Sequence, residues 1–107
     1  MGAMLEWFKH KAMEKSRSNI IALIGELIPV ANAAAANLDV TLTPNPRDIS
    51  AVHKLQDRLL IQLCGPIPLD QVKREIIYPV LAKPNVSDGA KMAVLHPYNT
   101  AKLNIKE

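Results

Sequence analysis

The chain has little of what most active sites are built from. It holds one cysteine, Cys64, and four isolated glycines among 107 residues. A single cysteine excludes an internal disulfide, and scattered glycines provide no loop to cradle a phosphate group. Its histidines, His10, His53 and His96, lack the three- or four-residue spacing of a local metal pair on a helix. We therefore expect no metal, no cofactor and no enzymatic activity, because the groupings that a catalytic site requires are missing.

Aromatic residues and net charge are also scarce. Only Trp7, Phe8, Tyr78 and Tyr98 are aromatic, although 49% of the residues are hydrophobic. The core must therefore be built from Ile, Leu, Val and Ala, which favours closely packed helices. The formal net charge of +3 is too small to indicate nucleic-acid binding by itself. A chain of this length without internal repeats or linkers is expected to form a single domain, residues 1–107.

The clearest local signal is a helix that begins after Asn45 and ends before Gly65. Asn45 is a good N-cap, Pro46 suits the first helical position, and Asp48 favours the positive end of the helix dipole. Gly65 suits the left-handed position after a helix, and Pro66 stops any continuation. Because a single apolar stripe cannot bury itself, the rest of the chain must cover this helix. The stripe consists of aliphatic residues at helical spacing: Ile49, Val52, Leu55, Leu59, Leu60 and Leu63.

Prolines are expected to divide the remaining chain into short helices. Pro29 should kink or end the apolar helix before it, Pro79 should do the same near Ile77, and Pro97 should end a helix capped by Ser87. The sequence therefore predicts a mainly α fold, a small bundle of four to five short proline-punctuated helices. Its parts are an apolar N-terminal helical arm (5–37), in which Arg17-Ser18-Asn19 is a possible interruption, a helical core (45–96) and an irregular tail (97–107).

Two segments alternate apolar and polar residues with the period of a β-strand. These are residues 38–43 and 102–106, and the first is rich in β-branched side chains. A single strand needs a partner, so the two segments are expected to pair, within the chain or across a dimer. An extended loop and an extended tail are the alternative.

The run Ile20–Ile28 is more apolar than one exposed helix requires. It follows a basic segment and precedes Ala31-Asn32-Ala33, and this order imitates a secretory signal. Glu26 and Pro29 interrupt the run well short of the ~20 residues of a membrane span. We therefore expect a cytoplasmic protein without membrane association. Core, partner interface and targeting segment are the three alternatives for residues 20–37.

A broad aliphatic surface with few charges is typical of helix-mediated interfaces. We therefore expect a small non-enzymatic adaptor, regulator or structural subunit that acts through oligomerisation, as small accessory proteins of phages and plasmids often do. Large aromatic side chains often dominate binding energy, so two of them are candidate anchors. The alternative is that the candidate residues fill the intramolecular core. They are Trp7, Phe8, Ile21, Leu23, Ile24, Leu27 and Ile28.

A second function is suggested by the order of the elements expected between Leu38 and Leu81. A short alternating strand, a helix, a glycine-containing turn and a second capped helix follow one another. This order resembles that of ribbon-helix-helix DNA-binding proteins and covers under half of the chain. The resemblance implies that Asp39, Thr41 and Thr43 would face the DNA, although an aspartate near phosphates is unfavourable. The basic candidates for nucleic-acid contact are Lys9, Lys11, Lys15, Arg17, Lys54, Arg58, Lys73 and Arg74.

Overall fold

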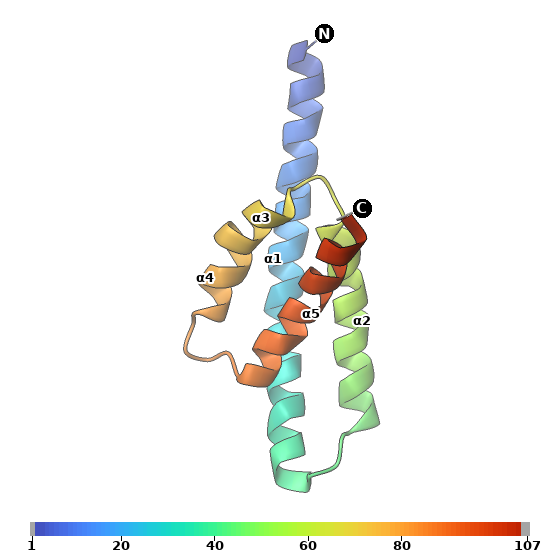
Figure 1. The fold of residues 1–107 in the computed structure, drawn as a ribbon, viewed down its shortest axis with the longest axis vertical. Coiled ribbons are helices and arrows are strands. Elements are labelled where there is room, and N and C mark those ends of the chain that lie inside the picture. The colour runs from blue at the N-terminus through green and yellow to red at the C-terminus, as the bar shows by residue number, and fades with distance from the viewer. Residues whose placement is uncertain (1, 106–107) are drawn as a thin grey trace.

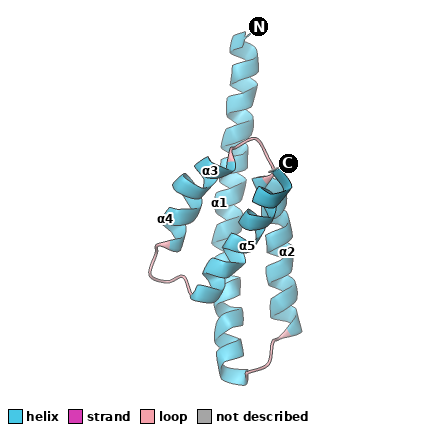
Figure 2. Ribbon diagram, in the orientation of Figure 1, coloured by secondary structure: helices cyan, strands magenta, loops and turns pink. Residues whose placement is uncertain are grey.

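The structure is a computed structural model that describes residues 2–105, with side chains described for residues 3–104. It confirms a mainly α fold. Figure 2 shows helices joined by loops, and the expected strand pair is not found within residues 2–105. The four helical segments are α1 (Gly2–Thr41), α2 (Pro46–Leu63), a composite of α3 (Leu69–Val72), the π-helical η1 (Lys73–Ile77) and α4 (Tyr78–Leu81), and α5 (Asp88–Ile105).

The long helix α1 forms the axis of an elongated molecule of 60 × 28 × 21 Å. Helix α2 runs back along α1, and α5 packs against both. Figure 1 places the composite segment 69–81 on the other side of α1 from α2. The N-terminal third of α1 projects beyond all of the other helices. The bundle therefore surrounds only the middle and the C-terminal part of its longest element.

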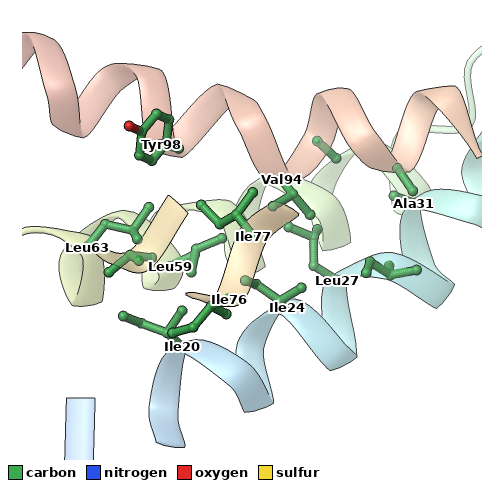
Figure 3. Close-up of a cluster of buried hydrophobic side chains, with 14 of the residues drawn as sticks. Ile20, Ile24, Leu27, Ala31, Leu59, Leu63, Ile76, Ile77, Val94 and Tyr98 are labelled. Carbon is green, nitrogen blue, oxygen red and sulfur yellow. The ribbon is translucent and has the colours of Figure 1, made fainter. Parts of the chain in front are cut away.

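The core is built around one stripe of α1. Ile20, Ile24 and Leu27 are at most 1% exposed, and they are spaced by three and four residues, so they share one helix face. Each such side chain contributes about 1.5–3 kcal/mol when fully buried. Figure 3 shows this stripe facing side chains from each of the other segments. Among these are Leu59 and Leu63 of α2, Ile76 and Ile77 of η1, and Val94 and Tyr98 of α5.

Both predicted helix starts are confirmed by their caps. The Asn45 side-chain oxygen accepts a hydrogen bond from the Arg47 N–H at 2.9 Å, and Pro46 follows the cap as expected. The Ser87 hydroxyl oxygen accepts one from the Ala90 N–H at 3.1 Å. Asn32 of α1 holds the chain that leads into this second cap. Its amide donates to the Asn85 carbonyl at 2.9 Å and accepts from the Ser87 N–H at 3.0 Å.

The expected interruptions of the N-terminal arm are wrong, because α1 continues through Arg17–Asn19 and through Pro29. A proline within a helix leaves the carbonyl four residues earlier without its usual N–H donor. For Pro29 that carbonyl belongs to Gly25. Both residues are exposed, so water can donate a hydrogen bond to the carbonyl. Burial of the opposite face, including Leu27, stabilises the helix across this position. Tertiary packing thus outweighs the local preference for a break.

The strand and tail predictions are also wrong. Leu38–Thr41 extend α1, because adding residues to an existing helix is cheap whereas a strand requires a partner. Residues 97–105 continue α5, so the chain there is helical and not an irregular tail. Position 106, the last of the second expected strand, lies outside the described residues. Helix α1 ends at Thr41, and the next residue, Leu42, has a φ of 58° in the left-handed region.

Pro97 is accommodated by a hydrogen bond from a neighbouring helix. Its missing N–H would have bonded the Ala93 carbonyl. The side-chain amide of Gln56 in α2 donates to that same carbonyl at 2.9 Å. A side chain of α2 therefore replaces the donor that α5 lacks, and this is why Pro97 does not end the helix as the sequence predicts.

Pro79 is accommodated in a different way. The π-helical turn η1 lies directly before it, and the Tyr78 N–H bonds the Lys73 carbonyl five residues earlier. The wider π-turn changes the hydrogen-bond pattern at the position where the proline lacks a donor. The expected helix end near Ile77 is therefore replaced by a local change in helix type, and α4 follows without a gap.

We expect the Gln56 hydrogen bond and Pro97 to be energetically coupled. Gln56→Met should destabilise the protein by about 1–2 kcal/mol, because the Ala93 carbonyl loses its donor. In a Pro97→Ala background the residue-97 N–H supplies a donor, so the same substitution should cost less than half as much. Chemical unfolding of the four proteins of this double-mutant cycle measures the difference. An equal cost in both backgrounds would contradict the compensation.

The backbone of Leu42 yields a second prediction. A left-handed residue at a helix end favours glycine, and the Leu42 side chain is 83% exposed. Leu42→Gly should therefore raise the free energy of unfolding by about 1 kcal/mol. Val40 is the matched control, since it is also 83% exposed but lies within α1. Val40→Gly should lower stability by a few tenths of a kcal/mol, and a similar loss for Leu42→Gly would argue against strain at residue 42.

Candidate protein-interaction site

The projecting part of α1, residues 3–15, is named the stalk. Four large apolar side chains lie on its first two turns, and each is more than half exposed. The exposed fractions are 69% for Met4, 66% for Leu5, 54% for Trp7 and 58% for Phe8. Scattered exposed apolar residues are ordinary, but four neighbours on the first turns of a projecting helix form a contiguous apolar surface. This group is called the stalk cluster.

The side chains of the stalk cluster and its charged neighbours contact one another. The rings of Trp7 and Phe8 meet edge to face, with centroids 5.0 Å apart and planes at 76°. The Lys11 ammonium lies 5.8 Å from the Trp7 ring centroid. One turn further on, His10 and Lys11 lie 2.6 and 3.9 Å from the Glu14 carboxylate. Such contacts limit the rotamers of the aromatic pair, so less conformational entropy is lost on binding.

The stalk cluster does not continue the stripe that forms the core. At about 100° per residue, Phe8 lies about 120° round the helix from Ile20. Lys9 and Met13 instead occupy the stalk positions above the core stripe. The aromatic face therefore points away from the side of α1 that the bundle covers, and only a separate molecule can bury it.

The predicted interface residues divide into two groups. Ile24, Leu27 and Ile28 lie in the intramolecular core, and Leu23 packs partly buried against it. Trp7 and Phe8 are exposed on the stalk, and Ile21 is 49% exposed beside the bundle. The stalk cluster also contains Met4 and Leu5, which sequence reasoning did not select. Their apolar character and helical spacing relative to Phe8 were the signal that could have identified them.

The predicted nucleic-acid residues are not gathered on one surface. Lys9, Lys11, Lys15 and Arg17 lie along α1, Lys54 and Arg58 on α2, and Lys73 and Arg74 on η1. Figure 1 shows η1 and α2 on opposite sides of α1. The strand on which the ribbon-helix-helix resemblance depends is absent from residues 38–43. Asp39 and Thr41 belong to α1, and Thr43 lies in the loop after it.

Some of these cations already have partners. Arg17 forms an ion pair and hydrogen bond with Glu75, and the Lys73 ammonium lies 5.7 Å from the Tyr78 ring centroid. Lys11 approaches Trp7, as described above. Glu6 and Glu14 alternate with the stalk lysines in sequence. The stalk is therefore a mixed-charge helix with an excess of lysine beside its aromatic tip.

An apolar groove lies at the opposite end of the bundle. It has a volume of about 360 Å³ and is bordered by the C-terminal part of α1, the start of α2 and the start of α5. Leu38 and Ile49 line it and are 42% and 41% exposed, and Asp48 is its formally charged lining residue. Small side chains leave it open, among them Ala31, Ala34, Ala35 and Ala93.

Sequence reasoning missed the groove as a site. Residues 33–36 are all alanine, and a neighbouring helix approaches them closely at Gly89. A Cβ added there would lie 3.1 Å from the Cβ of Ala35. The groove itself opens beside this contact, where Leu38 belongs to a helix and not to the expected strand. The helical state of residues 38–41 is thus what creates the groove wall.

Comparison with family models, with curated proteins and with solved structures found no match for the chain. Within the described residues, no three His, Cys, Asp or Glu side chains are grouped as metal ligands. The stretch Ala3–Thr41 is long and apolar enough to cross a membrane by length and composition, with a mean hydropathy of 1.6 in its most apolar 18-residue window. Core helices of soluble proteins and signal sequences satisfy the same criterion.

The Arg17–Glu75 pair yields a pH-dependent prediction. The Arg17 guanidinium donates to Glu75 and holds the pKa of that carboxyl below its usual value, and the Gln71 amide assists at 3.4 Å. A carboxyl with a lowered folded-state pKa stabilises the fold above its unfolded pKa, and this contribution disappears as the pH falls through the folded value. Thermal unfolding of Glu75→Gln and the unchanged protein should differ near neutral pH and converge in acid. A difference that persists at the most acidic pH would contradict this.

Proposed function

We propose that the chain is a small non-enzymatic interaction protein, an adaptor, regulator or structural subunit, that acts through self-association of its stalk. The bundle anchors α1, and the stalk presents its aromatic face to a partner. The observation that carries the proposal is the stalk cluster, four large apolar side chains held clear of the bundle. Trp7 and Phe8 are its expected anchors.

The energetics favour a partner for this surface. Trp and Phe side chains bury 150–250 Å² each when they are covered. Burial of apolar surface contributes about 25 cal/mol of favourable free energy per Å². The neighbouring Lys11 and Lys15 provide the polar rim that interfaces typically carry around an apolar centre. The long helix supplies rigidity, so the cluster is already in a helical conformation before it binds. Each of these features lowers the cost of association.

A second copy of this chain is the proposed partner. The stalk cluster is apolar at its tip and carries both lysines and glutamates along its length, so two copies need not repel one another strongly. We place this assembly in the cytoplasm, because Glu26 brings a charge into the middle of the apolar stretch of α1. The placement and the proposed accessory role rest on the sequence.

Multi-angle light scattering tests the proposed function. At tens of micromolar the protein should have a mass above that of one 11.8 kDa chain. Trp7→Ser combined with Phe8→Ser should reduce it to a single chain, because truncating one hot-spot residue costs about 2 kcal/mol, or roughly 30-fold in Kd.

Ile61→Ser is the control for this experiment. Ile61 is 69% exposed on α2, away from the stalk, and its substitution should leave the mass unchanged. Far-UV circular dichroism checks that each variant keeps its helices. A protein that is a single chain throughout the concentration range, with or without the stalk substitutions, would refute the proposed function.

A further inference from the structure

The stalk cluster and the apolar groove lie at opposite ends of one continuous helix. From Trp7 to Leu38 the helix rises about 45 Å at 1.5 Å per residue. The two surfaces therefore cannot meet within one molecule while α1 is intact. Each leaves apolar side chains exposed, Trp7 and Phe8 on the stalk and Leu38 and Ile49 in the groove.

The two surfaces are complementary in shape and chemistry. The stalk carries large rings on a narrow rod, whereas the groove is open because its wall is made largely of alanine. Its volume of about 360 Å³ falls within the ~300–1,000 Å³ of sites that bind ring-sized groups. The Asp48 carboxylate lines the groove, and the Lys11 ammonium lies near the Trp7 ring, so the charges at the contact are opposite in sign.

We propose that the stalk of one copy docks in the groove of the next. This inference rests on the proposed function, self-association, and specifies the surface that receives the stalk. Trp7 and Phe8 enter the groove between α1 and α2 of the neighbour, and the stalk lysines approach Asp48. Pairing of two stalks would leave both grooves uncovered, whereas head-to-tail docking covers both apolar surfaces of every interior copy.

The geometry has a consequence for the size of the assembly. A contact between two different surfaces is heterologous, so each copy retains a free stalk or a free groove after the first docking step. The assembly therefore continues to grow with concentration or closes into a ring, of which the reciprocal pair, with each stalk in the groove of the other copy, is the smallest.

Two complementary variants test the docking. The stalk variant, Trp7→Ser with Phe8→Ser, keeps its groove. The groove variant, Leu38→Lys with Ile49→Lys, keeps its stalk but places positive charge where the lysines should approach. Both groove positions are partly exposed, so lysine can extend into solvent. Ala34→Phe, which fills the groove without adding charge, is the second groove variant if the first is poorly folded.

Each variant alone should be a single chain by light scattering, whereas the unchanged protein should form assemblies of two or more chains. An equimolar mixture should form a 1:1 complex of two chains and grow no further, because its only intact stalk is docked in its only intact groove. Asp48→Asn in the stalk variant should weaken this complex two- to fivefold and reduce its sensitivity to salt.

Tryptophan fluorescence provides an independent measurement. Trp7 is the single tryptophan of the chain, so the stalk variant has none. The emission of the mixture therefore reports only the Trp7 of the groove variant. It should shift to shorter wavelength and become less accessible to acrylamide as the stalk variant is added. The control protein carries Ile61→Ser together with Leu38→Lys and Ile49→Lys, so it lacks an intact groove. Its addition should produce no shift in the Trp7 emission.

The outcomes distinguish this inference from the proposed function. A groove variant that still self-associates while the stalk variant does not would retain stalk-mediated association and overturn groove docking. A mixture that remains single chains would also overturn it. A protein that is monomeric throughout, but whose Trp7 emission shifts with phosphatidylserine vesicles, would overturn both proposals and assign the stalk to an anionic lipid surface.

Discussion

Burial of one stripe on α1 is the contact on which the whole structure depends. Ile20, Ile24 and Leu27 share one core cluster with side chains from each of the other helical segments. The buried part of α1 runs from Ser16 to Ala31, fewer than half of its residues. A bundle of this size cannot cover a 40-residue helix. Both ends of α1 therefore remain outside the core, and these ends are where the proposed interaction surfaces lie.

Local signals in the sequence predicted the helix starts well. Asn45 followed by proline, and Ser87 followed by aspartate, satisfy free N–H groups within a few residues, so they act with little influence from the rest of the fold. The apolar stripe of α2 was also predicted, from the helical spacing of its aliphatic residues. The aliphatic composition correctly indicated helices packed on helices.

Helix ends could not be predicted in the same way, because long-range contacts decide them. Pro97 lies within α5 because Gln56, 41 residues earlier in the chain, donates to the carbonyl that the proline leaves free. Pro29 is tolerated because the opposite face of α1 is buried. The alternation at residues 38–43 predicted a strand, but no partner strand exists within residues 2–105 and the preceding helix extends through Thr41. Local sequence rules indicate how much a residue destabilises a helix at its position. Tertiary contacts determine whether that destabilisation is offset.

The candidate site was predictable only in part for a related reason. Sequence alone could not separate the apolar residues of α1 that face the core from those that face outward, because the run as a whole is apolar. Trp7 and Phe8 lie outside the core, and their contact with a partner is a proposal. The groove could not be predicted because its wall joins the end of α1 and the start of α2 to the start of α5, which is distant in the chain.

The uninterrupted course of α1 fixes a phase relationship between its two ends. Adding or deleting one residue between Ala12 and Ile20 would turn the aromatic face by about 100° relative to the bundle, whereas a change of seven residues would turn it by only about 20°. The number of helical residues between the stalk cluster and the bundle therefore sets the direction of the aromatic face, and no tertiary contact is needed to fix it. The stalk could therefore be lengthened by two helical turns with little change in the direction of the aromatic face. A single inserted residue would change that direction.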